Sequence, residues 1–180
     1  MELVTYIDSL WVLIAGILVM FMQPGFMLVE TGFTRSKNSV NIVMKNFMDF
    51  SVGALTYWAF GFAFAYGGST LGGFIAYGNF FLEGDSSTYF FQVVFAATAA
   101  TIVSGSVAER TKFTSYLLFQ PFICGLIYPI VTHWVWSGQG WLTDLGFVDF
   151  AGSGVVHMVG GFAALAGIQV VGPRIGKFDN

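Results

Sequence analysis

Charged side chains are scarce in this sequence of 180 residues. Only 9% of the residues are Asp, Glu, Lys or Arg, whereas 56% are hydrophobic. A water-soluble domain usually carries about 25% charged residues, which cover its surface. The sequence also has a single cysteine, Cys124, so no intramolecular disulfide can form. The net charge of −3 argues against nucleic-acid binding. These shortages leave a membrane protein as the class that the composition favours.

Motifs for catalysis and cofactor binding are also missing. The sequence contains no glycine-rich nucleotide-binding motif and no Cys/His cluster with zinc spacing, and its two histidines are too far apart to form a metal motif. Met1–Val4 lacks the basic residues of a secretory signal, and the apolar run that follows is too long for one. We therefore expect no enzyme activity and no cofactor, and we interpret the first apolar run as a retained transmembrane helix.

Long apolar runs dominate what is present. A helix that spans a bilayer needs roughly 20 apolar residues, and five segments meet this requirement. We therefore predict an all-α membrane protein with five transmembrane helices, without a separate soluble domain. The predicted helices cover about Ser9–Phe33, Ile42–Tyr66, Tyr89–Val107, Phe113–Val135 and Gly152–Val171.

Basic residues follow only the first, third and fifth apolar segments, with Lys45 near the inner end of the second. The loops after the second and fourth segments carry acidic residues instead. Cytoplasmic loops of membrane proteins are enriched in Lys and Arg. The pattern predicts a multi-pass protein of the cell membrane with its N-terminus outside and residue 180 in the cytoplasm. The basic residues are Arg35, Lys37, Lys45, Arg110, Lys112, Arg174 and Lys177, and the acidic ones are Glu83, Asp85, Asp144 and Asp149.

Glycine and proline add expectations about packing. The last segment is rich in glycine and alanine, and small residues let helices approach closely in a membrane. We therefore expect this segment to be central and not to face lipid.

Glycine and proline also predict two local features. The glycine-rich stretch Gly67–Gly73 is long enough to fold over the outer face. Prolines within a helix remove a hydrogen-bond donor, so Pro24, Pro121 and Pro129 are expected to kink their segments.

His157 is the most informative single side chain. It lies about five residues into the last segment, within the bilayer, where an ionisable group is costly and usually functional. An imidazole accepts a proton at one nitrogen and donates from the other, which suits a polar, uncharged permeant in a narrow pore. The alternative is a hydrogen bond that only holds two helices together.

Other polar and aromatic residues allow two interpretations each. Asp149 precedes His157 by about two helical turns; it either caps the last segment or attracts cations to an outer vestibule. Trp136 belongs either to an interfacial aromatic belt or to a cation–π site, whereas Trp134, Trp141 and His133 are expected at the interface.

Four charged residues near the inner ends of the first two segments are expected to form structural pairs. Lys45 and Asp49 are four residues apart, which permits an ion pair within one helix, and Glu30 and Arg35 lie near them.

Four ordered blocks spread along the chain resemble the ammonium transporter (Amt/Mep/Rh) family, and its bacterial and archaeal Amt branch more than its Rh branch. The clearest is DFAGSGVVH at residues 149–157, which resembles the family signature that opens the fifth helix. The others are ETGFTRSKN at residues 30–38, the stretch from Phe91 to Arg110, and YPIVTHWVW at residues 128–136.

The resemblance implies roles for five residues. Phe95 corresponds to a phenylalanine that gates the outer mouth, and Trp136 to the tryptophan that binds ammonium, or its analogue methylammonium, by a cation–π contact. Gln92 matches a glutamine near that vestibule, and Asp149 an aspartate required beneath the binding site. His157 corresponds to the first of two pore histidines.

The resemblance also implies the architecture. The family fold has eleven helices, of which helices 1–5 and 6–10 are inverted repeats, and it assembles as a homotrimer in the lipid bilayer. Residues 1–180 are then the N-terminal half of a single transport domain that passes ammonia through a histidine-lined pore, with a PII-type protein as a candidate cytoplasmic regulator. The alternative is the ammonium-sensing input domain of a signalling protein.

Overall fold

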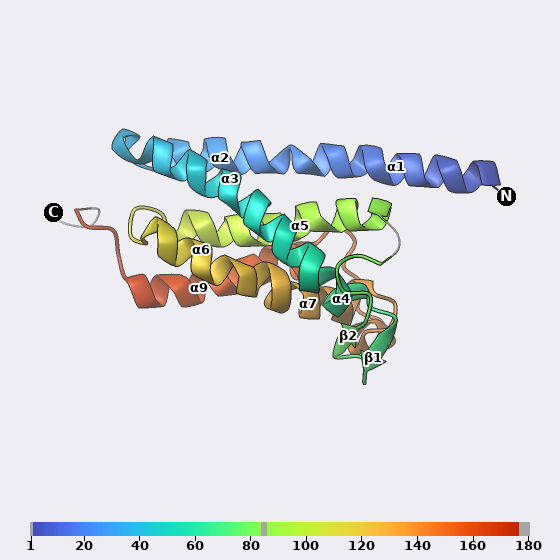
Figure 1. The fold of residues 1–180 in the computed structure, drawn as a ribbon. Helices are drawn as coiled ribbons and strands as arrows, with labels where there is room; N and C mark the ends of the chain where they lie inside the picture. Colours follow the sequence, from blue (N-terminus) through green and yellow to red (C-terminus); the bar gives the residue numbers. More distant parts are fainter. Residues whose placement is uncertain (1, 84–85, 177–180) are drawn as a thin grey trace.

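The computed structural model describes residues 2–83 and 86–176, and most of them are helical. The long helices run side by side, with α3 crossing the others obliquely (Figure 1). The first apolar segment forms α1 (Glu2–Met20) and α2 (Met22–Phe33). After a short 3-10 turn (Ser36–Asn38), the second forms α3 (Ser39–Thr56), a π-helical turn (Tyr57–Gly61) and α4 (Phe62–Tyr66).

The other three predicted segments are helical as well. The third is α5 (Ser86–Ser106). The fourth consists of α6 (Phe113–Phe122), a π-helical turn (Ile123–Ile127) and α7 (Tyr128–Trp136), followed by the short α8 (Trp141–Asp144). The fifth begins with a π-helical turn (Ser153–Met158) and continues as α9 (Val159–Val171).

Four helices in the described part of the chain are long and apolar enough to cross a membrane: Leu3–Phe33, Ser87–Ser106, Phe113–Asp144 and Ser153–Val171. The remaining segment is helical from Ser39 to Tyr66, roughly 40 Å at 1.5 Å per residue, which exceeds the ~30 Å apolar core of a bilayer. Its average polarity is higher because Lys45, Asn46 and Asp49 lie on it, and all three are buried. All five predicted segments are therefore helical, and four of them meet the length and apolarity of a membrane span.

Prolines coincide with two of the helix irregularities. Pro24 has no N–H to donate to the carbonyl of Met20, where α1 ends. Pro129 likewise leaves the carbonyl of Gly125 without its usual donor, and Gly125 lies within the π-helical turn before α7. Such turns insert a wider loop without ending the helix. Pro121 lies inside α6 and causes no break in it.

The central helix is α5, contrary to the expectation that the last segment would be central. Helix α5 packs against α1, α3 and α9, and 61% of the most apolar 18-residue stretch of its span is buried, against 28% for the last span. Small side chains make this packing close, since Ala96, Ala99 and Ala100 are fully buried. Helix α9 packs closely on one face only, where a Cβ at Gly160 would lie 2.9 Å from the carbonyl oxygen of Ala99.

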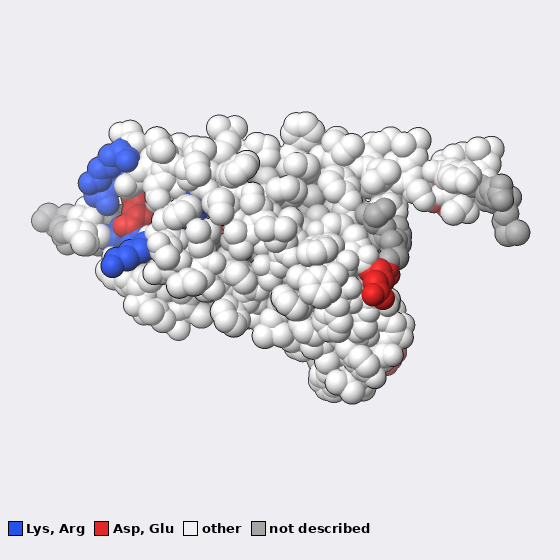
Figure 2. Space-filling view, viewed as in Figure 1, with Lys and Arg blue, Asp and Glu red and all other residues white. Residues whose placement is uncertain are grey.

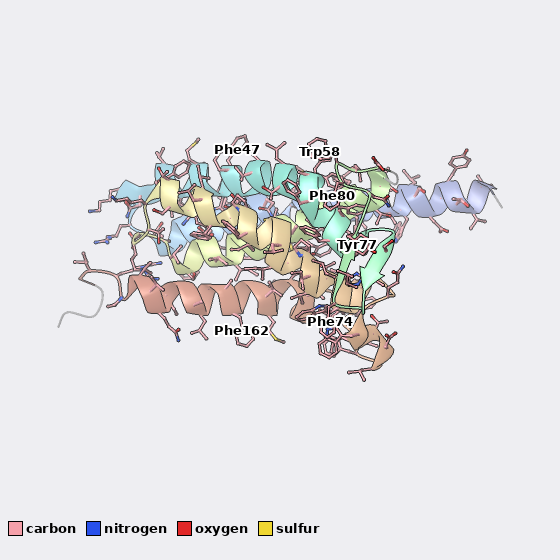
Figure 3. The ribbon with its side chains drawn as sticks, turned by 60° about the horizontal axis from the view of Figure 1, so that its bottom comes forward. Phe47, Trp58, Phe74, Tyr77, Phe80 and Phe162 are labelled. Carbon is pink, nitrogen blue, oxygen red and sulfur yellow. The ribbon has the colours of Figure 1, made fainter. Side chains whose placement is uncertain are left out.

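Large apolar side chains cover the outer surface of the helices. Figure 3 shows Phe47 of α3 and Phe162 of α9 pointing outward from opposite sides of the helix bundle. Each has 65% of its surface exposed. Exposed apolar area on this scale is typical of surfaces that meet lipid or other protein.

The glycine-rich loop after α4 forms a β-hairpin, which the sequence did not suggest. Strands β1 (Ser69–Leu71) and β2 (Ile75–Tyr77) are antiparallel, with Thr70 opposite Ala76. Gly72 and Gly73 turn the chain with φ of +58° and +75°, which glycine adopts without steric cost. The backbone N–H of Trp141 donates to the carbonyl of Gly73 (3.2 Å). The loop therefore folds over the outer end of α7, as expected.

His133 fixes the hairpin to the helices and is not an interfacial residue. Its side chain is buried; Nδ1 lies 2.9 Å from the carbonyl oxygen of Ala65 and Nε2 2.9 Å from Thr70 Oγ1. The indole N–H of Trp134 donates to the carbonyl of Phe74 (2.7 Å). His133 is therefore buried between the hairpin and α4, so its interfacial interpretation was wrong.

Charges separate to the two ends of the molecule. Figure 2 shows Lys and Arg side chains gathered at the end where α2 finishes, and an acidic patch at the opposite end near α4. This separation agrees with the orientation predicted from the loops. The predicted contributions of Asp85, Lys177 and residue 180 lie outside the described residues.

One carboxylate lies among the basic residues of the cytoplasmic end. Glu109 Oε1 accepts hydrogen bonds from the backbone N–H of Arg35 (2.9 Å), from Arg35 Nε (3.0 Å) and from Asn38 Nδ2 (2.7 Å), and Oε2 lies 3.3 Å from Arg174. Desolvation opposes its ionisation, but these donors outweigh that effect and lower the pKa of Glu109 to about 2. The loops after α2 and α5 and the segment after α9 are thereby joined.

Candidate functional site

Phe95 and Trp136 meet at the outer end of the helix bundle. Phe95 lies on α5 and Trp136 is the last residue of α7, and their ring centroids are 5.8 Å apart with planes at 70°. Phe91, one turn from Phe95 on α5, adds a second edge-to-face contact at 5.1 Å. All three rings are partly exposed. The structure thus brings together the two aromatic residues that the resemblance singled out, and it adds Phe91.

Trp136 is held by the segment that carries Asp149. Its indole N–H donates to the backbone carbonyl of Asp149 (2.7 Å). Its ring also lies close to Gly152, where a Cβ would be 3.2 Å from Trp136 Cη2. Gly152 has φ of +95°, a left-handed conformation that glycine adopts readily. The chain therefore turns into the last helix directly beside the tryptophan.

The carboxylate of Asp149 caps the last helix. Oδ1 accepts hydrogen bonds from the backbone N–H groups of Gly152 (2.9 Å) and Ser153 (3.0 Å), and Oδ2 from those of Gly154 (2.8 Å) and Val155 (2.8 Å). Four otherwise unpaired donors are satisfied, and an anion is favourable at a helix N-terminus. The capping interpretation is confirmed. The expected spacing of two helical turns is not, because Asp149 lies before the helix begins.

Asp149 remains ionised at neutral pH. Partial desolvation alone would raise the pKa of its carboxyl group, but the four backbone hydrogen bonds outweigh this and lower it below its usual range. The residue whose backbone carbonyl accepts the Trp136 indole hydrogen bond thus carries a fixed negative charge. This arrangement is electrostatically favourable for a small cation at the outer aromatic cluster, which we define as Phe91, Phe95 and Trp136.

His157 lies on the exposed face of the last helix. Its backbone N–H donates to the carbonyl of Gly152 (3.0 Å), five residues earlier, within the π-helical turn. The neighbours Val155 and Val156 are buried, whereas His157 and Met158 are exposed. Among the residues that the structure describes, no hydrogen-bond partner of the His157 ring is found. The interpretation as a helix–helix hydrogen bond within this part of the chain is therefore not supported, and its pore role stays a prediction.

Gln92 is buried on α5, one turn from Phe95. Its Oε1 atom has no hydrogen-bond partner within the described residues. The predicted place of Gln92 beside the vestibule also stays a prediction.

The predicted ion pairs of the inner half are not formed. Glu30, Lys45 and Asp49 are buried, but the ion pairs within the described ranges involve Glu109 with Arg35 and Arg174. Arg35 therefore bonds Glu109 and not Glu30. The expectation of an intrahelical Lys45–Asp49 pair was wrong because Lys45 Nζ donates to the backbone carbonyl of Ser104 (2.8 Å).

Comparison with known proteins identifies the family. Residues 10–180 match the model of the Ammonium Transporter Family. The chain is 49% identical to Ammonium transporter Amt2 of Archaeoglobus fulgidus, over 97% of this chain and 40% of that protein. The chain thus spans well under half the length of this relative, whose name describes a transporter and not an enzyme.

Solved structures share the fold. A structure described as a Sensor Amt Protein superposes with a TM-score of 0.94 at 41% identity, covering 99% of this chain and 48% of that one. Mep2 of Candida albicans superposes with a TM-score of 0.84 at 29% identity, covering 92% and 39%. With four apolar spans, an outer aromatic cluster and these matches, the chain belongs to the ammonium transporter family.

Proposed function

We propose that the protein containing this chain transports ammonium across the cell membrane and recruits the cation at the outer aromatic cluster. The observation that carries the proposal is the Phe95–Trp136 contact, with the Trp136 indole hydrogen-bonded to the backbone of the ionised Asp149. A tryptophan face holds a small cation with about 0.5–2 kcal/mol. The nearby carboxylate adds a favourable field, and family membership supports ammonium as the cation.

The proposed mechanism follows from the cost of moving a charge into hydrocarbon. A bare ion in such a medium is prohibitively unfavourable, so ammonium loses its proton after recruitment, and neutral ammonia crosses along an apolar pore. The exposed ring of His157 lies on the last helix, inward from the aromatic cluster. We propose that it lines this pore, which forms between residues 1–180 and a second repeat. A homotrimeric assembly and a PII-type regulator remain predictions from the family.

The outer site and the pore are tested by two substitutions in the full-length protein reconstituted in liposomes. For Trp136→Leu we expect the KM for methylammonium to rise about 2- to 30-fold, which corresponds to the loss of 0.5–2 kcal/mol of cation–π energy. For His157→Ala we expect a loss of uptake or of selectivity. Trp11→Leu is the matched control because Trp11 is an exposed tryptophan on α1, far along the chain from the site. Unchanged uptake and selectivity in His157→Ala would remove His157 from the mechanism.

A sensing function is the second candidate, favoured by the likeness to the Sensor Amt Protein. In a sensor, the same outer site would bind ammonium without needing throughput. Flux in proteoliposomes separates the two functions. Binding that depends on Trp136 without any methylammonium flux would favour the sensor, whereas saturable flux that Trp136→Leu weakens would favour the transporter.

A further inference from the structure

A second candidate site, made of polar and charged residues, lies in the inner half of the helix bundle, away from the outer aromatic cluster. Glu30 of α2 and Lys45 and Asp49 of α3 are only 7%, 3% and 0% exposed. These helices pack against α5 (Figure 1), which contributes Thr101 and Ser104. We call these five residues the inner polar cluster. Ionisable groups at this depth in a membrane protein are costly and usually functional.

Each carboxylate of the cluster has one oxygen with a donor and one without. Glu30 Oε2 accepts from Ser104 Oγ (3.0 Å) and Asn46 Nδ2 (3.1 Å), whereas Oε1 has no partner in the described ranges. Asp49 Oδ2 lies 3.3 Å from Thr101 Oγ1, and Oδ1 has no partner in the described ranges; the Tyr116 hydroxyl also faces this carboxyl group but donates to the carbonyl of Ala100 (3.1 Å). The hydroxyl of Thr101 has a single proton, which Gln23 and Ala97 also compete for. Asp49 in particular is short of donors.

Lys45 does not supply the missing hydrogen bonds. Its ammonium group donates to the backbone carbonyl of Ser104 (2.8 Å) and lies 4.9 Å from the centre of the Tyr116 ring. The other groups that face the cluster are neutral at pH 7: Tyr116 of α6 and Cys124 of the following π-helical turn are near Asp49, and Gln120 donates to its backbone carbonyl. Arg174, a further cation, bonds Glu109 and the carbonyl of Phe33.

The formal charges of the cluster do not cancel. Two carboxylates and one ammonium leave a net charge of −1 in a buried, low-dielectric site, which is strongly unfavourable. A carboxyl group that binds a proton removes this charge and gains an O–H donor. We propose that the inner polar cluster binds one proton, shared between Glu30 and Asp49. A metal ion fits less well because the described residues contain no group of three or more Asp, Glu, His or Cys that could hold one.

A cavity gives this proton a route to the cytoplasmic end. It has a volume of about 400 Å³ and lies between α2 and α5, with Glu30, Thr101 and Thr34 in its wall together with Arg174, which pairs with Glu109 among the basic residues. Gly105 leaves room for it, since a Cβ there would lie 3.4 Å from Glu30 Oε1. The bound proton therefore exchanges with cytoplasmic water. The proposal does not depend on ammonium transport.

Infrared difference spectroscopy of the full-length protein at pH 7 tests the proposal. Variants are subtracted from the wild type, and the C=O stretch of a protonated carboxyl group is read. If one proton balances two acids and one base, either Glu30→Gln or Asp49→Asn alone leaves a neutral pair with Lys45. Each single variant should then lose the whole intensity of one carboxyl band. Glu83→Gln, in an exposed outer loop, should leave the band unchanged.

Two further readings make the outcome decisive. Lys45→Met removes the base, so both Glu30 and Asp49 should be protonated. The intensity of the cluster's carboxyl C=O band should then double. Transfer to D2O should shift the band, because the cavity reaches water. A band that survives in either single variant, that fails to grow in Lys45→Met, or that does not shift in D2O would overturn the proposal. If Lys45→Met does not fold, the two isosteric variants decide alone, and their folding is checked by size-exclusion chromatography.

Discussion

Glu109 shows how one residue can set the geometry of the cytoplasmic end. Its carboxylate receives donors from the segment after α2 and from the segment after α9, while it lies itself after α5. Its backbone has a φ of +67°, a conformation that is unfavourable for most residues with a side chain. The hydrogen bonds and ion pairs hold this strained backbone conformation, in which the side chain links three segments.

The pH dependence of stability should report the contacts of Glu109. Its pKa is lowered from an ordinary value of 4.5 to about 2, so the ionised form favours folding. This contribution is complete above about pH 4.5 and is lost as the pH falls towards 2. In Glu109→Gln, we expect a lower unfolding temperature at pH 7 and a smaller further decrease between pH 4.5 and 2 than in the wild type, measured by differential scanning fluorimetry in detergent.

Glu83→Gln is the control for that measurement because Glu83 is exposed in an outer loop. Its unfolding temperature should follow that of the wild type across the same pH range. If Glu109→Gln also matched the wild type, the contacts of Glu109 would contribute nothing to stability.

Single site residues were predictable only as members of motifs. Phe95 is one of 21 phenylalanines, and no property of composition or spacing separates it from the rest. Phe91, which packs on Phe95, bounds one of the motif blocks, but the sequence assigns it no role for the same reason. His133 looked interfacial from its position near the helix end, but the hairpin that buries it consists of residues 69–77. A contact between such distant segments leaves no local pattern.

At the scale of elements, the contact between α5 and α9 depends on one glycine. A Cβ at Gly160 would lie 2.8 Å from Ile102 Cβ and 2.9 Å from the carbonyl oxygen of Ala99. Neither atom is the end of a flexible side chain, so Gly160→Ala should push the helices apart. We expect a loss of about 1–3 kcal/mol of stability, typical of overpacking, measured as a lower midpoint of thermal or denaturant unfolding.

The adjacent glycine provides a matched control. A Cβ at Gly161 would meet nothing within 4 Å, and alanine favours a helix by up to about 1 kcal/mol over glycine. Gly161→Ala should therefore be neutral or slightly stabilising. Equal destabilisation by both substitutions would mean that backbone flexibility, and not close packing, determines the effect.

The helices were predictable because each is a long apolar run, whereas two features of their arrangement were not. The abundance of glycine in the last segment suggested a central helix, but only one of its faces packs closely, and the buried alanines of α5 form the centre. The hairpin was missed because three-residue strands are too short for an alternating pattern to be recognised. Small residues show that helices approach closely, but not how many sides do so.

At the scale of the whole molecule, two kinds of asymmetry define how the chain lies in a membrane. The sides expose large apolar residues, and the ends carry opposite charges (Figures 2 and 3). The basic end belongs in the cytoplasm by the positive-inside rule. The inner polar cluster and its cavity then face the cytoplasmic half, and the outer aromatic cluster faces the outside, so the two sites open to opposite compartments.

This orientation predicts which loops a membrane-impermeant thiol reagent reaches. Lys37 lies in the exposed loop after α2, and Glu83 in the exposed loop before α5. In full-length protein whose other reactive cysteines are replaced, Glu83→Cys should react in intact cells, whereas Lys37→Cys should react only after permeabilisation. The buried Cys124 provides an internal control and should stay unlabelled in both conditions. The reverse labelling pattern would invert the protein in the membrane; the cavity beside Glu30 would then open outward, and the outer aromatic cluster would face the cytoplasm.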